Sequence, residues 1–416
     1  MELAKYSIGV GDRFGHQAKA QLAAIQEAQK AGVQVVPVWN KSNREHVIIG
    51  TCPADVRKEV TEAVKAVNYT GEYHIDADHI NIKNVDWFMD SSDFFTLDVA
   101  DFIGQPSPDA EINAFLAKHQ DLIGKELPIA GLSAPLTVSQ EMARNATAKV
   151  LFAIKEAGKL YRHIEAAKGG ADNIIVEVSM DETELPQQPV DMLFILAAIS
   201  DEGIPAQTVA PKFSGRFNKG IDYVGDLDQF EREFNDDLAI IAFAVSKFSL
   251  RKNLKLSVHT GSDKFSLYPR INKAIKRFNA GLHLKTAGTT WLEEIIGLAE
   301  ADGEALQLAK EIYSIAYERF EELRKPYATV IDIDWQKLPS PAEVNTWNAE
   351  KFTSTLRHVQ SNPNYNKHFR QMLHVAFKVA AEKGDVFFNA LEKYESVIAQ
   401  NVKTNILERH LKPTFF

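Results

Sequence analysis

Histidines and carboxylates stand at the ends of several short apolar runs in the sequence. Those that could bind a metal ion or transfer a proton are Asp78, His79, Glu177, His259 and His283. A charge that is buried without a partner is costly, so a purely structural core has no reason to collect such groups. Imidazoles combined with carboxylates suit zinc, manganese, cobalt or nickel. The pattern therefore predicts a divalent-cation site, although no local motif of the His-Glu-x-x-His type accompanies it.

The alternation of side chains indicates which of these residues point inward. In residues 254–259, Ser257 and His259 alternate with leucines and a valine. Successive side chains of a strand face opposite sides, so His259 lies opposite the apolar face that packs against helices. The same pattern directs His283 and Lys285 inward. One inward-facing histidine is usually a hydrogen-bonded core residue, but two at neighbouring strand ends favour metal binding.

The elements that must position these residues alternate along the chain. Short apolar runs predict eight strands, at residues 6–10, 34–38, 73–77, 94–99, 173–179, 206–211, 254–259 and 282–285. Amphipathic helical patterns lie between them, for example at residues 17–30, 54–67, 139–167 and 229–247. Such alternation is typical of an α/β protein with a parallel sheet. Eight units within about 290 residues favour a (β/α)₈ TIM-type barrel over an open doubly wound sheet.

An open doubly wound sheet would usually carry a glycine-rich phosphate-binding turn after its first strand. Residues 9–15, Gly-Val-Gly-Asp-Arg-Phe-Gly, have neither the dinucleotide-binding spacing nor a P-loop ending. We expect residues 1–320 to form the catalytic barrel and residues 321–416 to form a mostly helical C-terminal extension packed on it. A linker is expected near residues 337–342, and two helices at residues 368–409.

Basic side chains near the predicted strand ends could hold an anionic substrate. They are Arg13, Lys212, Arg216, Lys219, Lys264 and Lys285, with Lys212, Lys264 and Lys285 the leading candidates for a substrate carboxylate. Arg370 and His374, which lie four residues apart on one face of a predicted C-terminal helix, are a second possibility. Charge-assisted hydrogen bonds from such groups recognise carboxylates or phosphates. The alternative is that the cations pair with acidic residues of the same loops, and that the C-terminal pair only packs its helix on the barrel.

Other ionisable residues are interpreted as surface groups. The acidic side chains of residues 181–184 are expected in a solvated loop. Five histidines in polar sequence contexts are also expected at the surface, namely His46, His119, His163, His358 and His410.

The composition excludes several classes of protein. The chain has 416 residues and a net charge of −9, which argues against nucleic acid as a partner. Its single cysteine, Cys52, excludes an internal disulfide framework and a cysteine-rich zinc site. No secretory signal is visible, and no apolar run approaches the roughly 18 residues that span a bilayer. We therefore expect a cytoplasmic protein with no membrane partner.

Seven blocks of the sequence resemble the tagaturonate epimerase family. They are residues 11–15, 76–79, 177–183, 219–226, 257–266, 283–288 and 369–375. The resemblance implies an isomerase of bacterial hexuronate catabolism that interconverts D-tagaturonate and D-fructuronate with a divalent metal and an acid–base pair. Carried onto this sequence, it implies His79, His259 and His283 as metal ligands. It implies Asp78 and Glu177 as the proton-transferring pair.

The position of the inverted carbon in the implied reaction limits the possible mechanisms. Counted from the primary alcohol, the ketone is carbon 2 and the inverted centre is carbon 4, whose hydrogen the ketone does not acidify. Transient oxidation is disfavoured because no dinucleotide fingerprint is present. We therefore expect retro-aldol cleavage between carbons 3 and 4, with the metal as Lewis acid and Asp78 or Glu177 removing the carbon-4 hydroxyl proton. Neutral ketohexoses such as fructose and tagatose could also react, and the chain could form a homo-oligomer.

Two other interpretations of the same residues stay open. A metal-dependent sugar isomerase or aldolase on the same barrel would share the metal and the carboxylates. A non-catalytic sugar-acid-binding protein would not need a stoichiometric metal. Metal content and product analysis separate these interpretations.

Overall fold

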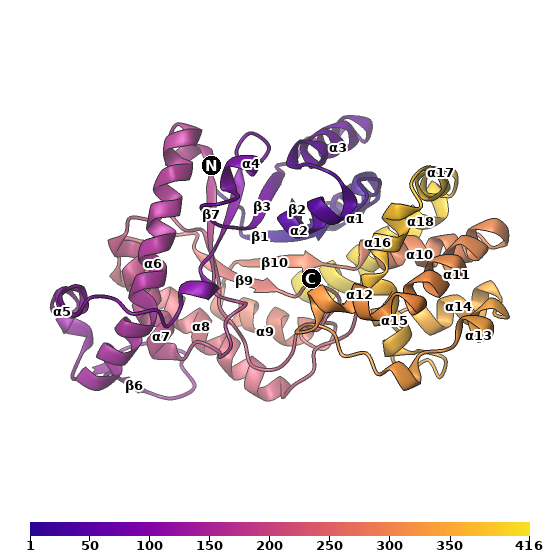
Figure 1. Ribbon diagram of the computed structural model, residues 1–416. Helices are drawn as coiled ribbons and strands as arrows, with labels where there is room; N and C mark the ends of the chain where they lie inside the picture. The colour runs from indigo at the N-terminus through magenta and orange to yellow at the C-terminus, as the bar shows by residue number, and fades with distance from the viewer.

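Eight parallel strands form one closed barrel (Figure 1). The computed structural model describes the backbone of residues 1–416 and every side chain except those of residues 286 and 287. Around the barrel the strand order is β1-β10-β9-β8-β7-β4-β3-β2. The strands are β1 Tyr6–Gly11, β2 Val36–Ser42, β3 His74–Ile80, β4 Phe94–Asp98, β7 Ile175–Ser179, β8 Thr208–Ala210, β9 Lys255–His259 and β10 Leu282–Ala287. The predicted (β/α)₈ barrel is confirmed, and each predicted strand overlaps an observed one.

The strands place a row of polar side chains inside the barrel. Thr96, Glu177 and Thr208 stand side by side in register on β4, β7 and β8, and all are fully buried. On the other wall, His259 is paired in register with Lys285. Branched apolar side chains normally fill the interior of such a barrel. The polar row therefore marks the carboxyl-terminal half of this barrel as a site for chemistry.

Helices cover the outside of the barrel. Those that connect its strands are α1 Ala18–Lys30, α2 Asn43–Ile49, α3 Pro53–Ala66, α4 Val85–Phe88, α5 Asp109–Lys118, α6 Gln140–Lys168, α7 Pro189–Asp201, α8 Leu227–Lys247 and α9 Tyr268–Phe278. The four clearest helical patterns of the sequence correspond to α1, α3, α6 and α8. A short antiparallel pair, β5 (Glu126–Leu127) and β6 (Leu136–Thr137), lies between α5 and α6. None of the helices is long and apolar enough to cross a membrane, among the residues that the structure describes.

The helices after β10 gather on one side of the barrel, where Figure 1 draws them in orange and yellow. They are α10 Thr290–Glu300, α11 Gly303–Glu318, α12 Phe320–Arg324, α13 Pro341–Asn345, α14 Ala349–Leu356, α15 Lys367–Val375, α16 Phe377–Glu382, α17 Asp385–Lys393, α18 Glu395–Thr404, a π-helix Asn405–Leu411 and α19 Lys412–Phe415. The prediction of two helices over residues 368–409 is wrong. One break is at Gly384, whose φ of 54° is a left-handed conformation that glycine adopts freely.

The last helices complete the outer layer of the barrel. α18 packs against α1 and α10, and α19 packs against α9. The rings of Tyr6 in β1 and Phe415 in α19 lie 5.1 Å apart. The segment from α18 to α19 therefore lies between α9 and α1, while α10 contacts α11 and α14 in the helical cluster. The predicted division of the chain at residue 320 stays a prediction.

A buried ionic network joins the C-terminal helices to the loop after β9. Asp263 lies 2.8 Å from the Arg370 guanidinium, 3.0 Å from His358 Nδ1 and 3.3 Å from His410 Nε2. All four side chains are fully buried. Surface placement is therefore wrong for His358 and His410. It is also wrong for His46 and His119, which are buried against protein partners, whereas His163 is exposed as predicted.

Replacing Asp263 with asparagine should destabilise the protein by about 3–5 kcal/mol, because Arg370 would stay buried without its counter-charge. Urea unfolding followed by circular dichroism measures this free energy. Asp109→Asn is the matched control, because Asp109 and its partner Arg144 are 80% and 46% exposed. An Asp263→Asn variant as stable as this control would contradict the structural role of the network.

Candidate active site

Lys285 lies at the centre of a buried ionic cluster at the carboxyl ends of the strands. Its Nζ is 2.8 Å from Asp76 Oδ2, 2.9 Å from Asp78 Oδ1 and 3.2 Å from Glu177 Oε1. It also donates a hydrogen bond to the Thr96 hydroxyl. An ammonium has three protons to donate, so these four partners leave none for a further ligand.

The mutual charges of this cluster set its protonation. Burial alone would lower the pKa of Lys285, but the three carboxyl groups around it raise that pKa well above its usual range. Burial disfavours ionised Asp78 and Glu177, yet Lys285 holds the pKa of each well below its usual range. Burial, reinforced by Asp78 and Glu177, raises the pKa of Asp76 to about 7 despite the nearby ammonium. The cluster thus has one cation, two carboxylates and one carboxyl group that titrates near neutral pH.

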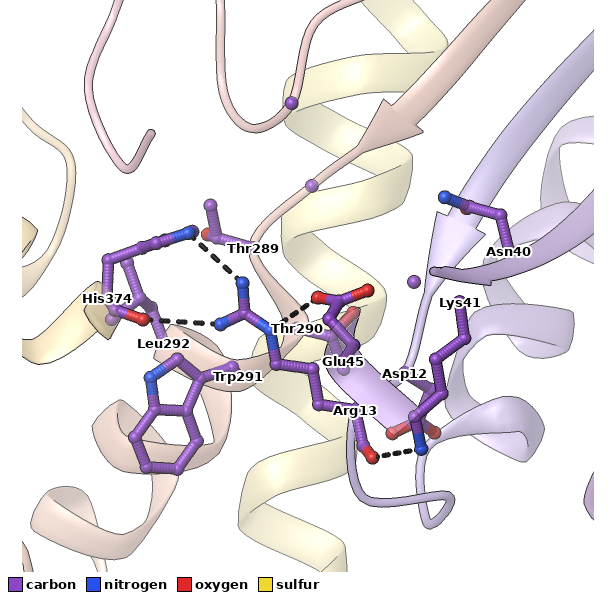
Figure 2. Close-up of a pocket in the computed structure, with 13 residues that line it drawn as sticks. Asp12, Arg13, Asn40, Lys41, Glu45, Thr289, Thr290, Trp291, Leu292 and His374 are labelled. Carbon is purple, nitrogen blue, oxygen red and sulfur yellow. Dashed lines mark hydrogen bonds and ion pairs between the residues drawn. The ribbon is translucent and has the colours of Figure 1, made fainter. Parts of the chain in front are cut away.

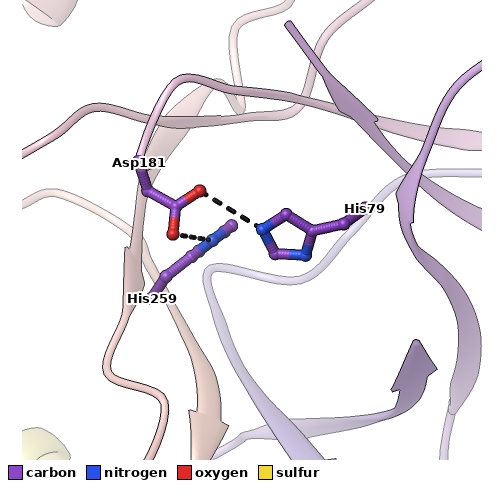
Figure 3. A group of neighbouring side chains, drawn as sticks. All are labelled: His79, Asp181 and His259. Carbon is purple, nitrogen blue, oxygen red and sulfur yellow. Dashed lines mark hydrogen bonds and ion pairs between the residues drawn. The ribbon is translucent and has the colours of Figure 1, made fainter. Parts of the chain in front are cut away.

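Each of the two carboxylates holds the ring of one histidine. Asp78 Oδ1 lies 2.7 Å from His79 Nδ1, and Glu177 Oε1 lies 2.8 Å from His259 Nε2. The other ring nitrogens converge on Asp181, at 3.2 Å from His79 Nε2 and 3.1 Å from His259 Nδ1 (Figure 3). Two imidazoles and a carboxylate therefore face one another at the mouth of the barrel.

These three residues, His79, Asp181 and His259, could hold a metal ion, because one ligand atom of each lies within 4.8 Å of the others. Metal-binding histidines almost always donate their second ring N–H to a carboxylate or a carbonyl, which fixes the tautomer. Asp78 and Glu177 stand where such partners are needed. His259 Nδ1 is buried and faces Asp181 Oδ2 at 3.1 Å. The donor set fits zinc, manganese, cobalt or nickel.

An irregular piece of backbone presents His79. Its φ is 51°, in the left-handed region that residues with a Cβ rarely adopt. The register between β3 and β4 shifts between Ala77 and Ile80, so His79 lies within this irregularity. Such conformations persist where neighbouring contacts hold them, and they cluster at functional sites. Asp78 and Asp181 supply those contacts here.

Asp181 is absent from the site predicted from the sequence, because its acidic neighbours look like a solvated loop. The Ser179 hydroxyl donates to Asp181 Oδ1 at 2.6 Å, which fixes the carboxylate over the strand end. Glu177, Ser179 and Asp181 lie two residues apart along one line. This spacing of two continues the inward-facing row of β7 and could have identified Asp181.

His283 lies elsewhere than the sequence predicted. It faces inward, but it is paired in register with Ser257, two residues nearer the start of the strands than Lys285. Its Nδ1 lies 2.9 Å from the Ser7 hydroxyl, and its ring lies 5.3 Å from that of Phe94. Burial lowers its pKa to about 3. The structure does not bring His283 into the group formed by His79, Asp181 and His259.

Most of the predicted anion-binding cations already have protein partners. The Lys264 ammonium donates to three backbone carbonyls and to Ser262 Oγ, and its side chain is fully buried. Arg370 donates to two carbonyls as well as to Asp263 and a threonine hydroxyl. Lys212 is different, because its ammonium has no partner among the residues that the structure describes. Of the three leading lysine candidates, Lys212 is the one that remains available.

Arg13 and His374 meet at a separate pocket (Figure 2). Arg13 Nε lies 2.9 Å from Glu45 Oε1, and Nη2 lies 3.2 Å from His374 Nε2. The pocket is lined by residues of β1, β2, α2, α10 and α15 and by the loops after β1, β9 and β10. Arg13 and His374, both predicted to bind substrate, are thus brought together, but they form a hydrogen bond with each other.

The model of the tagaturonate epimerase family matches residues 1–413 of the chain. The chain belongs to the tagaturonate epimerase family. The resemblance seen in the sequence blocks is therefore confirmed, and so is the prediction of an isomerase. Because the match spans almost the whole chain, the barrel and the C-terminal helices both belong to the tagaturonate epimerase fold.

Individual relatives agree with this family. A tagaturonate/fructuronate epimerase from Thermotoga maritima is 28% identical over 421 residues, covering 97% of this chain and 80% of that protein. The fructuronate-tagaturonate epimerase UxaE from Cohnella laeviribosi, in a crystal structure with two glycerols, is 25% identical with a TM-score of 0.82. That match covers 99% of this chain and 82% of the other. A probable tagatose 6 phosphate kinase from Sinorhizobium meliloti shares the fold at 11% identity and a TM-score of 0.52, covering 97% of this chain and 92% of the kinase.

Replacing Lys285 with methionine should destabilise the protein most at neutral pH. Asp78 and Glu177 would become buried charges without a cation, at a cost of about 3–5 kcal/mol. Their folded-state pKa values are depressed, so the stability from Lys285 is present above the unfolded carboxyl pKa of about 4 and is lost as the pH falls through the folded values. In the variant, burial without Lys285 would raise the pKa of both carboxyl groups above their unfolded values, so protonation would relieve the buried charges as the pH falls toward 4. Urea unfolding at pH 7, 5.5 and 4 should therefore show a difference from wild type that shrinks as the pH falls.

The control for this series is Lys393→Met, which removes an ammonium from an exposed pair with Glu304. It should leave stability nearly unchanged at each pH, because exposed ion pairs contribute little. A Lys285→Met deficit that is equal at all three pH values would contradict the electrostatic role of Lys285.

Proposed function

We propose that the protein interconverts D-tagaturonate and D-fructuronate with a divalent cation held by His79, Asp181 and His259. The observation that carries this proposal is the convergence of two carboxylate-held imidazoles on Asp181 at the mouth of the barrel. Membership of the tagaturonate epimerase family supports the reaction, and the relatives from Thermotoga maritima and Cohnella laeviribosi bear both sugar acids in their names.

The proposed ligand set differs from the sequence-based one at one position. Asp181 takes the place of His283, whose ring is hydrogen-bonded deeper in the barrel. His79 would offer Nε2 and His259 would offer Nδ1, because Asp78 and Glu177 hold their other nitrogens. When bound, the cation supplies Lewis-acid stabilisation for negative charge that develops on substrate oxygens.

The reaction inverts carbon 4, counted from the primary alcohol, and the carbon-4 hydrogen is not acidified by the ketone at carbon 2. We propose retro-aldol cleavage instead. The carbon-4 hydroxyl loses its proton, its oxygen becomes an aldehyde, and the electron pair of the bond between carbons 3 and 4 moves into the carbon-2 carbonyl. Recombination on the other face of the aldehyde gives the epimer. The charge has a stabilised position at carbon 3, whereas a carbanion at carbon 4 has none.

We propose Asp78 as the base that takes the carbon-4 hydroxyl proton and returns it. Its Oδ1 contacts Lys285, whereas Oδ2 has no partner among the described residues. Glu177 is fully buried, and both of its oxygens are engaged, by His259 and by Thr208 among others. We therefore propose Glu177 as a positioning residue that acts through His259. Lys285 keeps Asp78 ionised near neutral pH, as a general base requires.

Lys212 is the basic side chain that we propose to contact the substrate near the reacting carbons. It follows Thr208 and Ala210 at a spacing of two along the inward-facing row of β8. A charge-assisted hydrogen bond from its free ammonium to a substrate oxygen would contribute roughly 1.5–3 kcal/mol.

Conversion of D-tagaturonate deuterated at carbon 4 tests the reaction and the bond that breaks. The expected product is D-fructuronate that keeps its label, with only a small secondary isotope effect, because retro-aldol cleavage leaves the carbon-4 hydrogen in place. NMR spectroscopy reads both product and label. Loss of deuterium to solvent would contradict the retro-aldol step, and retention with a large primary effect would indicate hydride transfer. A shifted carbonyl would identify an isomerase, and two released fragments would identify an aldolase.

Variants of the proposed ligands test the cation site. His259→Ala and Asp181→Asn should each lose stoichiometric metal and turnover, because each removes one of three donors. Mass spectrometry of the metal content measures binding independently of activity. His163→Ala is the control, since His163 is exposed and pairs with Asp86. His283→Gln should retain the metal. If His283→Gln instead lost the metal while Asp181→Asn kept it, the result would support the ligand set predicted from the sequence.

A further inference from the structure

The pocket that holds Arg13 adjoins the proposed cation site. Gly261 lines this pocket and follows His259 by two residues. Two residues span at most about 7 Å, so the wall of the pocket lies beside the group that contains His259. A substrate whose reacting carbons lie at that group can therefore extend its far end toward the pocket.

The cations that line the pocket are already engaged. Arg13 contacts Glu45 and His374, and the Lys41 ammonium donates to the Arg13 carbonyl oxygen at 2.6 Å. Lys41 is also 96% buried, since its exposed fraction is 4%. An anion that entered the pocket would need a cation that is not yet paired.

Lys219 supplies such a cation. Its Nζ lies 3.0 Å from the position that a Cβ would occupy at Gly261, so the absence of a side chain there makes room for the ammonium. Its side chain has no hydrogen bond or ion pair with the rest of the described chain. Its charge reaches the pocket, because Lys219, after burial and Arg13, contributes to lowering the pKa of His374 well below its usual value.

The backbone around Lys219 is fixed from two sides. Its N–H donates to the Val330 carbonyl at 2.7 Å, and Gln371 Nε2 donates to its carbonyl at 2.9 Å. The next residue, Gly220, donates its N–H to Ser262 Oγ at 3.0 Å. The C-terminal helical region and the loop after β9 thus hold the backbone of Lys219 in place, while its ammonium stays free. A cation held in this way loses less conformational entropy when it binds a ligand.

We propose that Lys219 binds the carboxylate of the sugar acid and selects uronates over neutral ketoses. This inference rests on the proposed function, which supplies the acidic substrate. Lys264, Lys285 and Arg370 donate to protein acceptors and have no such freedom. Lys212, whose ammonium also has no partner among the described residues, continues the inward row of β8 toward the reacting carbons. The two lysines therefore have separate tasks, at opposite ends of the substrate.

Substitution of Lys219 separates binding of the carboxylate from the chemical step. Lys219→Met should raise the KM for D-tagaturonate about 10- to 100-fold, the loss expected for one charge-assisted hydrogen bond. The kcat should change much less, because the contact is made equally in ground state and transition state. Lys219→Arg keeps the charge and should restore most of the KM. Lys212→Met should lower kcat instead.

Lys65→Met is the matched control, because Lys65 is exposed on α3, on the outside of the barrel. Thermal melting followed by circular dichroism establishes that each variant folds. A KM unchanged in Lys219→Met overturns the proposal, as does an equal rise in Lys65→Met. A Lys219→Arg variant no better than Lys219→Met also overturns it, since the effect would then lie in packing rather than charge.

Failure of the proposed function has a different signature. A wild-type protein that does not convert D-tagaturonate would refute the epimerase activity but not the carboxylate site. Calorimetric titration with D-tagaturonate then decides the role of Lys219. Binding that is 10- to 100-fold weaker in Lys219→Met than in wild type supports the site, and equal or absent binding in both overturns it.

Discussion

The ammonium of Lys285 is the charge on which the candidate active site depends. It extends from β10 into the interior of the barrel and contacts carboxyl groups of β3 and β7. Without a cation, these carboxylates could not stay ionised together in a fully buried space. Because they are ionised, they can hold the rings of His79 and His259, and those rings then face Asp181. One buried cation thus orders the tautomers and orientations of the whole group.

The C-terminal helices are part of the active site as well as of the fold. His374 in α15 contacts Arg13, and Gln371, one turn earlier in the same helix, binds the carbonyl of Lys219. Asp263 ties the same helix to the loop after β9 through Arg370. The barrel supplies the proposed cation ligands, and the helices fix the loops after β1, β8 and β9. Both parts must therefore be in place before the site has its shape.

Much of this arrangement could be predicted from the sequence, because strands leave a strong local signal. The eight apolar runs, and the alternation that turns His259 and Lys285 inward, depend only on neighbouring residues. The depth of a side chain in the barrel depends on the register between strands, which a single sequence does not reveal. This is why the sequence predicts His283 beside His259, although His283 lies two residues deeper in the barrel. The partners of Lys285 and Arg370 cannot be predicted from the sequence either, because these partners are distant from the two residues along the chain.

The position of α18 and α19 has a consequence for how the protein is made. These helices pack against α1 and α9, so residues near position 400 shield a helix that begins at residue 18. Contacts across so long a separation form slowly, because the intervening chain must first be ordered. During synthesis, the apolar face of α1 that packs against α18 stays uncovered until residues 395–404 have left the ribosome. A chaperone that binds this face during translation would protect the nascent chain for as long as α1 is uncovered.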